Sequence, residues 1–522
     1  MGYDVDIRST NITIESDMIG RRKILIPIDK ETFDSNPKIY IKKYLAEIEE
    51  QHIKNIAEMQ YLQNYKKGIQ DILNKIRANG TSKVNNISIT NYAKEIIDFK
   101  KGFYVGKPIT YVSTNSDDND NITYLNKYLR DTKKSSKDLK KYDNILTTGI
   151  GYTFIAPKKK SYNSEKESPF DYIILDNENV CMVYSDDMIR SPLFSVYFSK
   201  RNIANKDGIV ENYYTYTCYF NFQSVEFYKD GIDYKVYKEK SQEPIEQPIT
   251  EYELNPDRMG AFEAVLSGLN SCNVVRSNQL DDIEEFVNAW IVFLNQNPEY
   301  IKNHQNEIRE AKMLALKTNN PNTPADVKML TSQLSHGEIN DLYKNMKQDI
   351  FNIVGVPVGT SSTGQGVSGT SQQYGSGWEN AQAIATVDTS YMEDFERQDL
   401  EKILYICKKG VNPKLNNLDS SDIEIKYIIN KSNDIMNKAQ SFKYLVDLGV
   451  PYASAFEITQ LHDDAHSLGQ LSEENYKIRE KFKNDLEIEK EKAIYANQKE
   501  IDSKYVTIIN EEDNSLNKEN DI

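Results

Sequence analysis

Two short patterns in this chain contain residue types that could do chemistry. His462-Asp-Asp-Ala-His466 separates two histidines by four positions, so on a helix both imidazoles would share one face and could hold zinc. Gly364-Gln-Gly-Val-Ser-Gly369 fits the G-x-G-x-x-G pattern with which some enzymes bind a dinucleotide pyrophosphate. A metal-dependent or dinucleotide-dependent enzyme is therefore one interpretation of the sequence.

Neither pattern has the sequence context that its chemistry requires. Zinc enzymes with this histidine spacing use glutamate as the base, whereas the chain has the shorter Asp463, and Gly469 predicts an early helix end. A dinucleotide site needs a strand before the glycines, but a helical pattern precedes Gly364. The sequence also lacks G-x-x-x-x-G-K-[ST] and G-x-S-x-G motifs. We therefore predict no catalytic residue, no metal, no cofactor and no enzymatic activity.

The most unusual segment of the chain is residues 355–377, which contain seven glycines. No Asp, Glu, Lys, Arg or His occurs from Ile350 to Trp378, although 27% of the chain is charged. Glycine and small hydroxyl residues allow a backbone to pass close to another polymer. A neutral surface can contact DNA without holding its phosphates, so the segment is interpreted as a loop that faces a channel. A plain surface linker is the alternative.

Composition limits the class of protein further. The 522 residues carry a formal net charge of −15, which argues against an outer surface that binds nucleic acid. The 35 tyrosines suit large, partly hydrated interfaces. The four cysteines are far apart and predict reduced thiols. The first residues do not resemble a signal peptide, and the apolar run 289–294 is too short to span a membrane.

The elements that must position the glycine-rich segment follow from hydrophobic periodicity. Helices are expected at 41–76, 91–100, 259–290, 335–354, 378–407, 433–448, 452–462 and 473–498. Strands are expected at 23–27, within 102–111, at 149–155, across an antiparallel region at 170–240, and at 423–429. The acidic residues 501–522 are expected to be a disordered tail. The predicted class is α+β and mainly helical.

Several motifs, in this order, resemble those of tailed-bacteriophage portal proteins, in the subfamily typical of long-tailed phages of Gram-positive hosts. Gly102-Phe-Tyr-Val-Gly-Lys-Pro-Ile-Thr-Tyr111 is similar to the family's G-(Y/F)-x-x-G-x-P-I-x-Y stretch. Gly149-Ile-Gly-Tyr152 resembles its glycine turn before a strand, and 248–263 resembles its entry into the first stem helix. Residues 364–369 resemble its tunnel loop, although the usual S-G-V-A-L run is replaced by Ser368-Gly-Thr-Ser-Gln-Gln.

The resemblance implies the portal architecture, a ring typically of twelve copies around a channel for double-stranded DNA. The wing would comprise residues 1–255, the stem helices 256–290 and 335–354, the clip 291–334 and the tunnel loop 355–377. Residues 378–430 would form the long wing helix and a returning strand, and 431–500 the helical crown.

The resemblance also implies two sets of site residues. The DNA-facing tunnel loop would consist of Gly359, Thr360, Ser361, Ser362, Thr363, Gly364, Gln365, Gly366, Val367, Ser368, Gly369 and Thr370. The terminase- and adaptor-facing clip would present Glu299, Lys302, Glu307, Arg309, Glu310, Lys312 and Lys317. A solvated helix face would have the same charges as this clip set.

The implied partners are further copies of the chain, double-stranded DNA, the terminase large subunit, the major capsid and scaffolding proteins, and neck adaptor proteins, with no membrane. The expected location is the portal vertex and neck of the virion, after assembly in the host bacterial cytoplasm. The expected role is DNA packaging and ejection as a head–tail connector. Another phage head protein without a DNA channel is the alternative.

Overall fold

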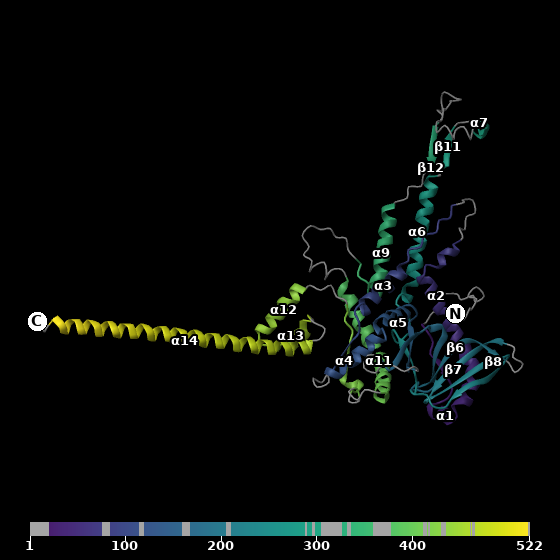
Figure 1. Ribbon diagram of the computed structural model, residues 1–522. Helices are drawn as coiled ribbons and strands as arrows, with labels where there is room; N and C mark the ends of the chain where they lie inside the picture. Colours follow the sequence, from purple (N-terminus) through teal and green to yellow (C-terminus); the bar gives the residue numbers. More distant parts are fainter. Residues whose placement is uncertain are drawn as a thin grey trace. The chain divides into compact units, whose positions relative to one another are not determined.

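The structure is a computed structural model whose helices and strands confirm a mixed α and β protein (Figure 1). The described residues are 20–75, 84–113, 119–158, 167–204, 210–287, 290–294, 298–303, 326–330, 336–358, 377–410, 415, 418–429, 435–459, 461 and 465–519. The chain divides into two compact units, residues 1–430 and 431–522, and each is described by itself.

A six-stranded sheet in the first unit has the order β1-β5-β6-β7-β8-β9. Its strands are β1 (Ile24–Ile26), β5 (Val180–Ser185), β6 (Pro192–Ala204), β7 (Val210–Phe220), β8 (Gln223–Asp230) and β9 (Asp233–Lys240). Within this sheet only β1 pairs in parallel, with β5, so the predicted antiparallel region at 170–240 is confirmed. The core of this layer joins the sheet to α1 (Lys30–Ser35) and α2 (Pro37–Lys66) through Phe33, Ile41 and Leu45.

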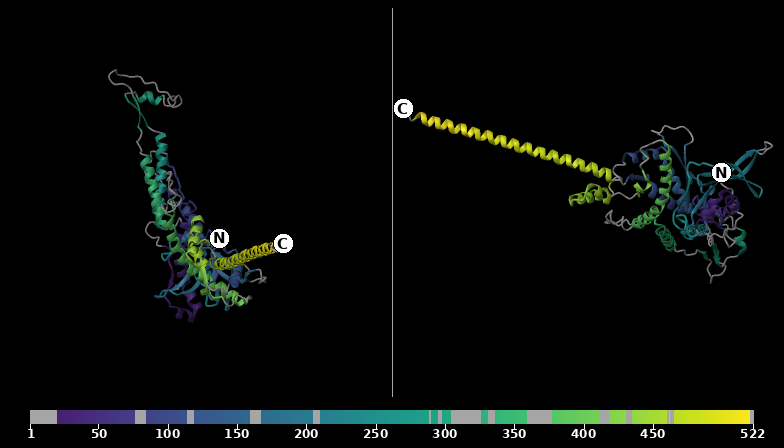
Figure 2. Two further views of the ribbon diagram at one scale, coloured as in Figure 1. Left: turned by 90° about the vertical axis from the view of Figure 1, so that its left-hand side faces the viewer. Right: turned by 90° about the horizontal axis from the view of Figure 1, so that it is seen from below.

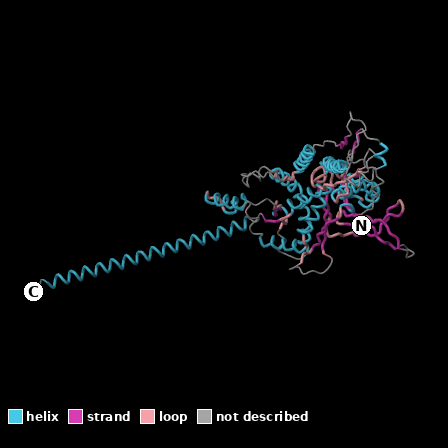
Figure 3. Tube along the Cα trace, turned by 90° about the horizontal axis from the view of Figure 1, so that it is seen from above, coloured by secondary structure: helices cyan, strands magenta, loops and turns pink. Residues whose placement is uncertain are grey.

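A second layer surrounds a three-stranded antiparallel sheet, β10-β3-β4. Its strands are β10 (Ile249–Glu253), β3 (Ile150–Pro157) and β4 (Phe170–Leu175). The helices that contribute to this core include α3 (Tyr92–Val105), α4 (Asn119–Asp131), α5 (Lys134–Thr148) and α11 (Trp378–Gly410). A two-stranded sheet of β2 (Thr110–Ser113) and β13 (Ile423–Lys426) returns the chain to this layer. Figure 3 shows the strands of the unit gathered toward one side and many of its helices toward the other.

Two helices, α6 (Leu266–Val287) and α9 (His336–Val354), extend together from this core (Figure 1). At their outer end β11 (Trp290–Leu294) pairs with β12 (Asp326–Leu330), and α7 (Pro298–Asn303) lies beside this hairpin. Short 3-10 turns at Asp71–Asn74, Asn177–Asn179, Glu263–Val265 and Ser420–Asp422 link other elements.

The second unit contains α12 (Ile435–Asp447), α13 (Tyr452–Thr459) and α14 (Ala465–Glu519). Phe442 of α12 packs on Phe456 of α13, with ring centroids 4.2 Å apart. Gly469 allows α14 to approach α13, because a Cβ there would lie 2.5 Å from the Ala453 Cα. The remainder of α14 is a single helix that continues well past the other two (Figure 2).

Three expectations are corrected by these bounds. The helix expected at 91–100 continues to Val105 as α3, so the strand expected within 102–111 begins only at Thr110, and Phe103, Tyr104 and Val105 are buried in the core. Gly469 was expected to end a helix, but it lies within α14, where its missing side chain serves the contact with α13. The tail was expected to be disordered, yet 501–519 continue α14, because one helix already formed propagates easily through helix-forming residues.

Candidate functional site

The helices α6 and α9 lie side by side and run in opposite directions (Figures 1 and 2). Successive contacts join Gly268 to Ile350, the Arg276 guanidinium to the Tyr343 ring at 5.1 Å, and Gln279 Nε2 to Asn340 Oδ1 at 3.1 Å. A Cβ on Gly268 would be only 3.1 Å from Ile350 Cγ1, so this glycine allows close approach of the helices. The pair therefore forms a closely packed stem.

An extended segment, residues 84–91, lies along α6 and holds it to the rest of the unit. The N–H groups of Asn86, Ser88 and Thr90 donate to Asp281 Oδ1 (2.5 Å), Ser277 Oγ (3.0 Å) and Asn273 Oδ1 (2.9 Å). Two extended residues advance about 6.6 Å and four helical residues about 6.0 Å, so the spacings match. One polar stripe of α6 thus satisfies alternate N–H groups of the segment.

The two ends of the glycine-rich segment meet at the base of this stem. Gly355, just after α9, has φ +69°, a conformation that glycine adopts without strain. Gly377, just before α11, has φ +82°, and a Cβ there would lie 3.8 Å from the Pro357 Cα. Asn380 Nδ2 donates to the Asn352 carbonyl at 3.1 Å. The residues that precede and follow segment 359–376 are therefore neighbours in space.

Helix α3 contacts both helices that carry this loop. The ring of Trp378, the first residue of α11, packs against Phe99 and Phe103 of α3 at centroid distances of 5.9 and 6.0 Å. At the other end of α3, the hydroxyl groups of Tyr92 and Tyr343 lie 2.8 Å apart, which joins α3 to α9. The positions of both loop ends are thus set by one helix.

A buried cluster of charges fixes α11 against α5. Glu396 Oε2 accepts from Lys141 Nζ at 2.6 Å, and its Oε1 pairs with Lys134; all three side chains are buried. Asp138 pairs with both lysines. Burial alone would raise the pKa of Glu396, but the two ammonium groups outweigh it and hold the pKa below its ordinary value.

A second buried carboxylate on α11, that of Asp399, fixes the same helix against the three-stranded sheet. It accepts hydrogen bonds from the hydroxyl groups of Thr153, Thr250 and Tyr252. Thr153 belongs to β3, and the other two belong to β10. The helix that follows the glycine-rich segment is therefore held on two sides.

The profile of a known protein family, described as "Phage portal protein, SPP1 Gp6-like", matches residues 45–377, which include α6, α9 and the loop. The chain belongs to this phage portal protein family. The portal protein of Bacillus phage SPP1 is 23% identical over 245 residues, which cover 44% of this chain and 45% of that protein. The match therefore spans about half the length of this curated relative.

A solved structure described as the neck of an empty GTA particle computed with C6 symmetry is also similar. It shares 12% identity and covers 71% of this chain and 90% of its own, with a TM-score of 0.37. That score is too low to establish a shared fold. The family profile and the relative from phage SPP1 confirm the resemblance to portal proteins of phages that infect Gram-positive bacteria.

The structure describes only part of the two predicted sets of portal site residues. The tunnel-loop set, Gly359 to Thr370, lies outside the described residues. In the clip set, Glu299 and Lys302 are exposed on α7, whereas Glu307, Arg309, Glu310, Lys312 and Lys317 lie outside the described residues. The structure does describe α9 and α11, which flank the tunnel-loop set, and α6 and α9, which flank the clip set.

Sequence reasoning missed the residues of α3 that hold the loop ends. Trp378 is one of only two tryptophans and stands directly after the uncharged segment, which was a usable signal. Nothing in the spacing of Phe99 and Phe103 indicated their contact with it. Asp388 lies on α11, within the helix expected at 378–407, and its carboxylate accepts a hydrogen bond from the Tyr104 hydroxyl at 2.6 Å.

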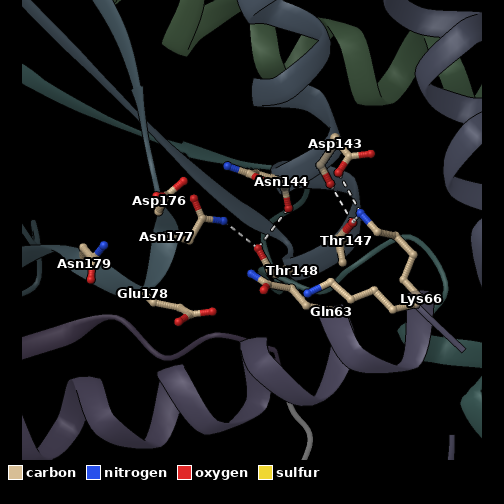
Figure 4. A pocket seen from close by; sticks show the side chains of 11 residues that line it. Gln63, Lys66, Asp143, Asn144, Thr147, Thr148, Asp176, Asn177, Glu178 and Asn179 are labelled. Atoms are coloured by element: carbon tan, nitrogen blue, oxygen red, sulfur yellow. Dashed lines mark hydrogen bonds and ion pairs between the residues drawn. The ribbon is translucent and has the colours of Figure 1, made fainter. Parts of the chain in front are cut away.

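A polar cleft of about 330 Å³ lies between α2, α5 and the turn after β4 (Figure 4). Lys66 Nζ reaches from α2 to Asp143 Oδ2 at 2.6 Å and to Thr147 Oγ1 at 3.1 Å, while Asn177 donates to Thr148 at 2.8 Å. Burial would raise the pKa of Asp143, but Lys66 and Lys101 lower it. These contacts join three elements of the first unit and give Lys66 and Asp143 a structural role.

The two patterns that suggested an enzyme are only partly described. Gly364–Gly369 and His462 to Asp464 lie outside the described residues, and His466 lies in the first turn of α14. The described part of the chain contains no group of three or more His, Cys, Asp or Glu side chains that could hold a metal ion. Its helices also include none with the length and apolar content needed to cross a bilayer.

Proposed function

We propose that copies of this chain form a ring at one vertex of a phage head and that double-stranded DNA passes through it during packaging and ejection. Membership in the portal family supports this role. The ring, typically of twelve copies in the family, would make the virion's portal vertex, assembled in the host cytoplasm. The chain would act as a structural protein without cofactor, and the terminase would supply energy from ATP.

The observation that carries the proposal is that the two described ends of the uncharged segment meet at the base of the stem. Its ends meet between Pro357 and Gly377, and both adjoining helices are anchored to α3. Such a loop can project from a rigid base without moving the stem. We assign Gly359 to Thr370 as the part that faces DNA.

Electrostatics explains why this loop would lack charge. Ring symmetry repeats every residue, so one lysine at the tip would become twelve beside one duplex. Twelve phosphate contacts would give a log–log salt dependence with a slope of about −11 and hold the DNA tightly. Twelve aspartates would repel the DNA within about a Debye length. Hydroxyl and amide groups exchange hydrogen bonds with passing phosphates at little net cost.

The remaining elements fit the other parts of a portal subunit. The wing would comprise 1–255 with α11 and β13, the stem α6 and α9, the clip 291–334, and the crown 431–500. The clip charges, including Glu299 and Lys302, would dock the terminase large subunit and later the neck adaptor. The wing and crown would contact the major capsid and scaffolding proteins.

Light scattering and negative-stain microscopy of the purified chain test the proposal. Twelve copies of 60.2 kDa give a particle of about 722 kDa with a central hole. A different head protein, without a channel, would give no annulus. A species that remains near 60 kDa under all conditions would contradict the proposed function.

A further inference from the structure

The outer part of α14 exposes large apolar side chains along most of its length. Every side chain from Glu474 to Ile508 is exposed, and past Tyr476, which touches Tyr452 of α13, the helix extends away from α12 and α13 (Figure 2). Eight apolar residues form a wide stripe: Leu471, Ile478, Phe482, Leu486, Ile494, Ile501, Tyr505 and Ile508. An isolated helix in water gains nothing from this surface, which indicates a partner.

The spacing of the wide stripe constrains that partner. From Leu471 to Ile508 the stripe takes 508 − 471 = 37 residues for ten turns, or 3.7 residues per turn. A strict heptad repeat of about 3.5 would predict a left-handed coiled-coil pair, whereas an 11-residue repeat gives about 3.67. At about 3.7 residues per turn, the stripe favours neighbouring helices that wind around one another with a slight right-handed twist.

A second, narrower apolar stripe occupies the opposite face of α14. It consists of Ile488, Tyr495 and Val506, which are 48%, 74% and 58% exposed. At about 100° per residue these three positions lie roughly half a turn from the wide stripe. Two different apolar faces suit a head-to-tail contact, wide stripe on narrow stripe, which generates a ring. A dimer with two-fold symmetry would instead use the same apolar face of α14 on both copies.

Charges on α14 gather into two adjacent blocks, each with one exception. Lys477, Arg479, Lys481 and Lys483, interrupted by Glu480, are followed by Asp485, Glu487, Glu489 and Glu491, interrupted by Lys490. Each block places like charges four residues apart, as at Arg479 and Lys483, and such pairs destabilise a lone helix by a few tenths of a kcal/mol each; opposite charges have this spacing only where the blocks meet, as at Lys483 and Glu487. Within the described residues neither block forms an ion pair of its own. An opposite block on another helix would remove the repulsion.

The blocks also match the two apolar faces. Arg479 and Lys483 stand three residues before Phe482 and Leu486 and so flank the wide stripe. Glu491 lies between Ile488 and Tyr495 on the narrow stripe, with Glu487 one turn earlier. If parallel helices are offset by eight residues, about 12 Å, Arg479 faces Glu487 and Lys483 faces Glu491 of the next copy.

We propose that residues 471–508 of α14 bind the same segment of neighbouring copies in parallel, with this offset of eight residues. The wide stripe of each helix contacts the narrow stripe of the next, and the basic block faces the acidic block. The inference rests on the proposed ring, because rotation about one axis makes all copies run in the same direction. In a closed ring this offset requires each helix to tilt around the axis, as strands tilt in a barrel.

Disulfide cross-linking of the full-length chain tests the register. In the double variant Arg479→Cys with Glu487→Cys, each helix presents one thiol to the preceding copy and one to the following copy. The four native cysteines are buried, so the two new thiols are the ones exposed for cross-linking. We expect oxidation to produce a ladder of covalent species extending well beyond the dimer on denaturing gels. Each single variant, and Arg479→Cys with Lys499→Cys, which is out of register, should stay mostly monomeric.

Light scattering of the same samples separates the two proposals. Rings with a ladder would support both. Rings without a ladder, or with dimers only, would overturn the α14 register and leave the proposed function intact. Absence of rings, with no ladder, would overturn both.

Charge reversal gives an independent readout, because contact between copies of α14 shields the helix from a protease. Chymotryptic cleavage after Tyr495 is the reporter, since none of the changes alters the residues beside it. Arg479→Glu with Lys483→Glu should increase this cleavage rate about fivefold at low salt, as should Glu487→Lys with Glu491→Lys. Combining all four changes should restore the original rate. Equal rates in all variants would contradict the proposed charge pairing.

Discussion

Glu396 and Lys141 form an ion pair of 2.6 Å in which both side chains are fully buried. Removing a buried partner leaves an uncompensated charge, which typically costs ~3–5 kcal/mol. We therefore expect Glu396→Gln to lower the free energy of unfolding by about that amount, measured by urea denaturation. Glu393→Gln removes the partly exposed pair with Arg397 on the same helix and should cost less than about 1 kcal/mol. Equal effects of the two changes would contradict the assigned role of the cluster.

The same pair predicts a pH dependence. Burial raises the pKa of Glu396, but Lys134 and Lys141 lower it more strongly, so the folded pKa lies below the ordinary value of 4.5. A depressed carboxyl pKa contributes stability above pH 4.5 that is lost as pH falls through the folded value. The difference in unfolding free energy between the native chain and Glu396→Gln should be largest above pH 4.5 and should narrow on acidification.

His52 predicts a second, separate pH window. Its ring is buried against Phe198, and Nε2 donates to the Glu178 carbonyl at 3.1 Å. Burial lowers the pKa of His52 from 6.5 to about 4, against the opposing effects of Glu178 and Glu251. Between pH 6.5 and 4 the His52 imidazole is therefore protonated in the unfolded chain but neutral in the folded chain. The free energy of unfolding falls by up to ~3 kcal/mol as the pH is lowered through this range. In His52→Gln this loss of unfolding free energy should disappear. If the unfolding free energies of the native chain and of His52→Gln change in parallel with pH, His52 is not the source of the loss.

Gly355 predicts a backbone effect at the base of the loop. Its φ is +69°, and a Cβ would lie 2.5 Å from Ile384 Cδ1. Gly355→Ala should therefore lower the unfolding free energy by ~1–3 kcal/mol. Gly102→Ala is the matched control, because Gly102 lies in α3 with no atom within 4 Å of its Cβ position, and alanine favours helix. The control should be neutral or slightly stabilising in the same melt.

The exposed charges of α7 test the docking proposal. Reversing both, as Glu299→Lys with Lys302→Glu, should weaken binding of the terminase large subunit several-fold in a pull-down or calorimetric titration at low salt. Lys235→Glu, in β9 of the six-stranded sheet, should leave binding unchanged. Ring mass should be the same in all variants. Unchanged binding of the reversed variant would remove α7 from the docking surface.

Much of the order of elements could be predicted from the sequence, and the reasons are local. Period-two patterns predicted the antiparallel region at 170–240, and Gly377 with Trp378 marked the start of α11. The portal resemblance was visible because its motifs occur in short stretches such as 102–111. Those signals depend on neighbouring residues, which a single sequence contains.

The contacts that position the site could not be predicted in the same way. Lys141 and Glu396 are 255 positions apart, and no spacing rule links a lysine on one helix to a glutamate on another. The packing of Trp378 on Phe99 and the hydrogen bonds from 86–90 to α6 likewise depend on tertiary structure. Helix ends were misplaced near Gly102 and Gly469, because packing overrode the local preference of glycine.

The most direct test of the proposed function is where the loop lies when DNA is in the ring. A photo-crosslinking amino acid in place of Gln365 should cross-link to DNA in packaged particles, whereas the same group at Ile232, which is 98% exposed on the proposed wing, should not. Cross-linking at position 365 alone is the predicted result. Intact, filled rings that cross-link at neither position, or equally at both, would contradict a DNA-facing loop.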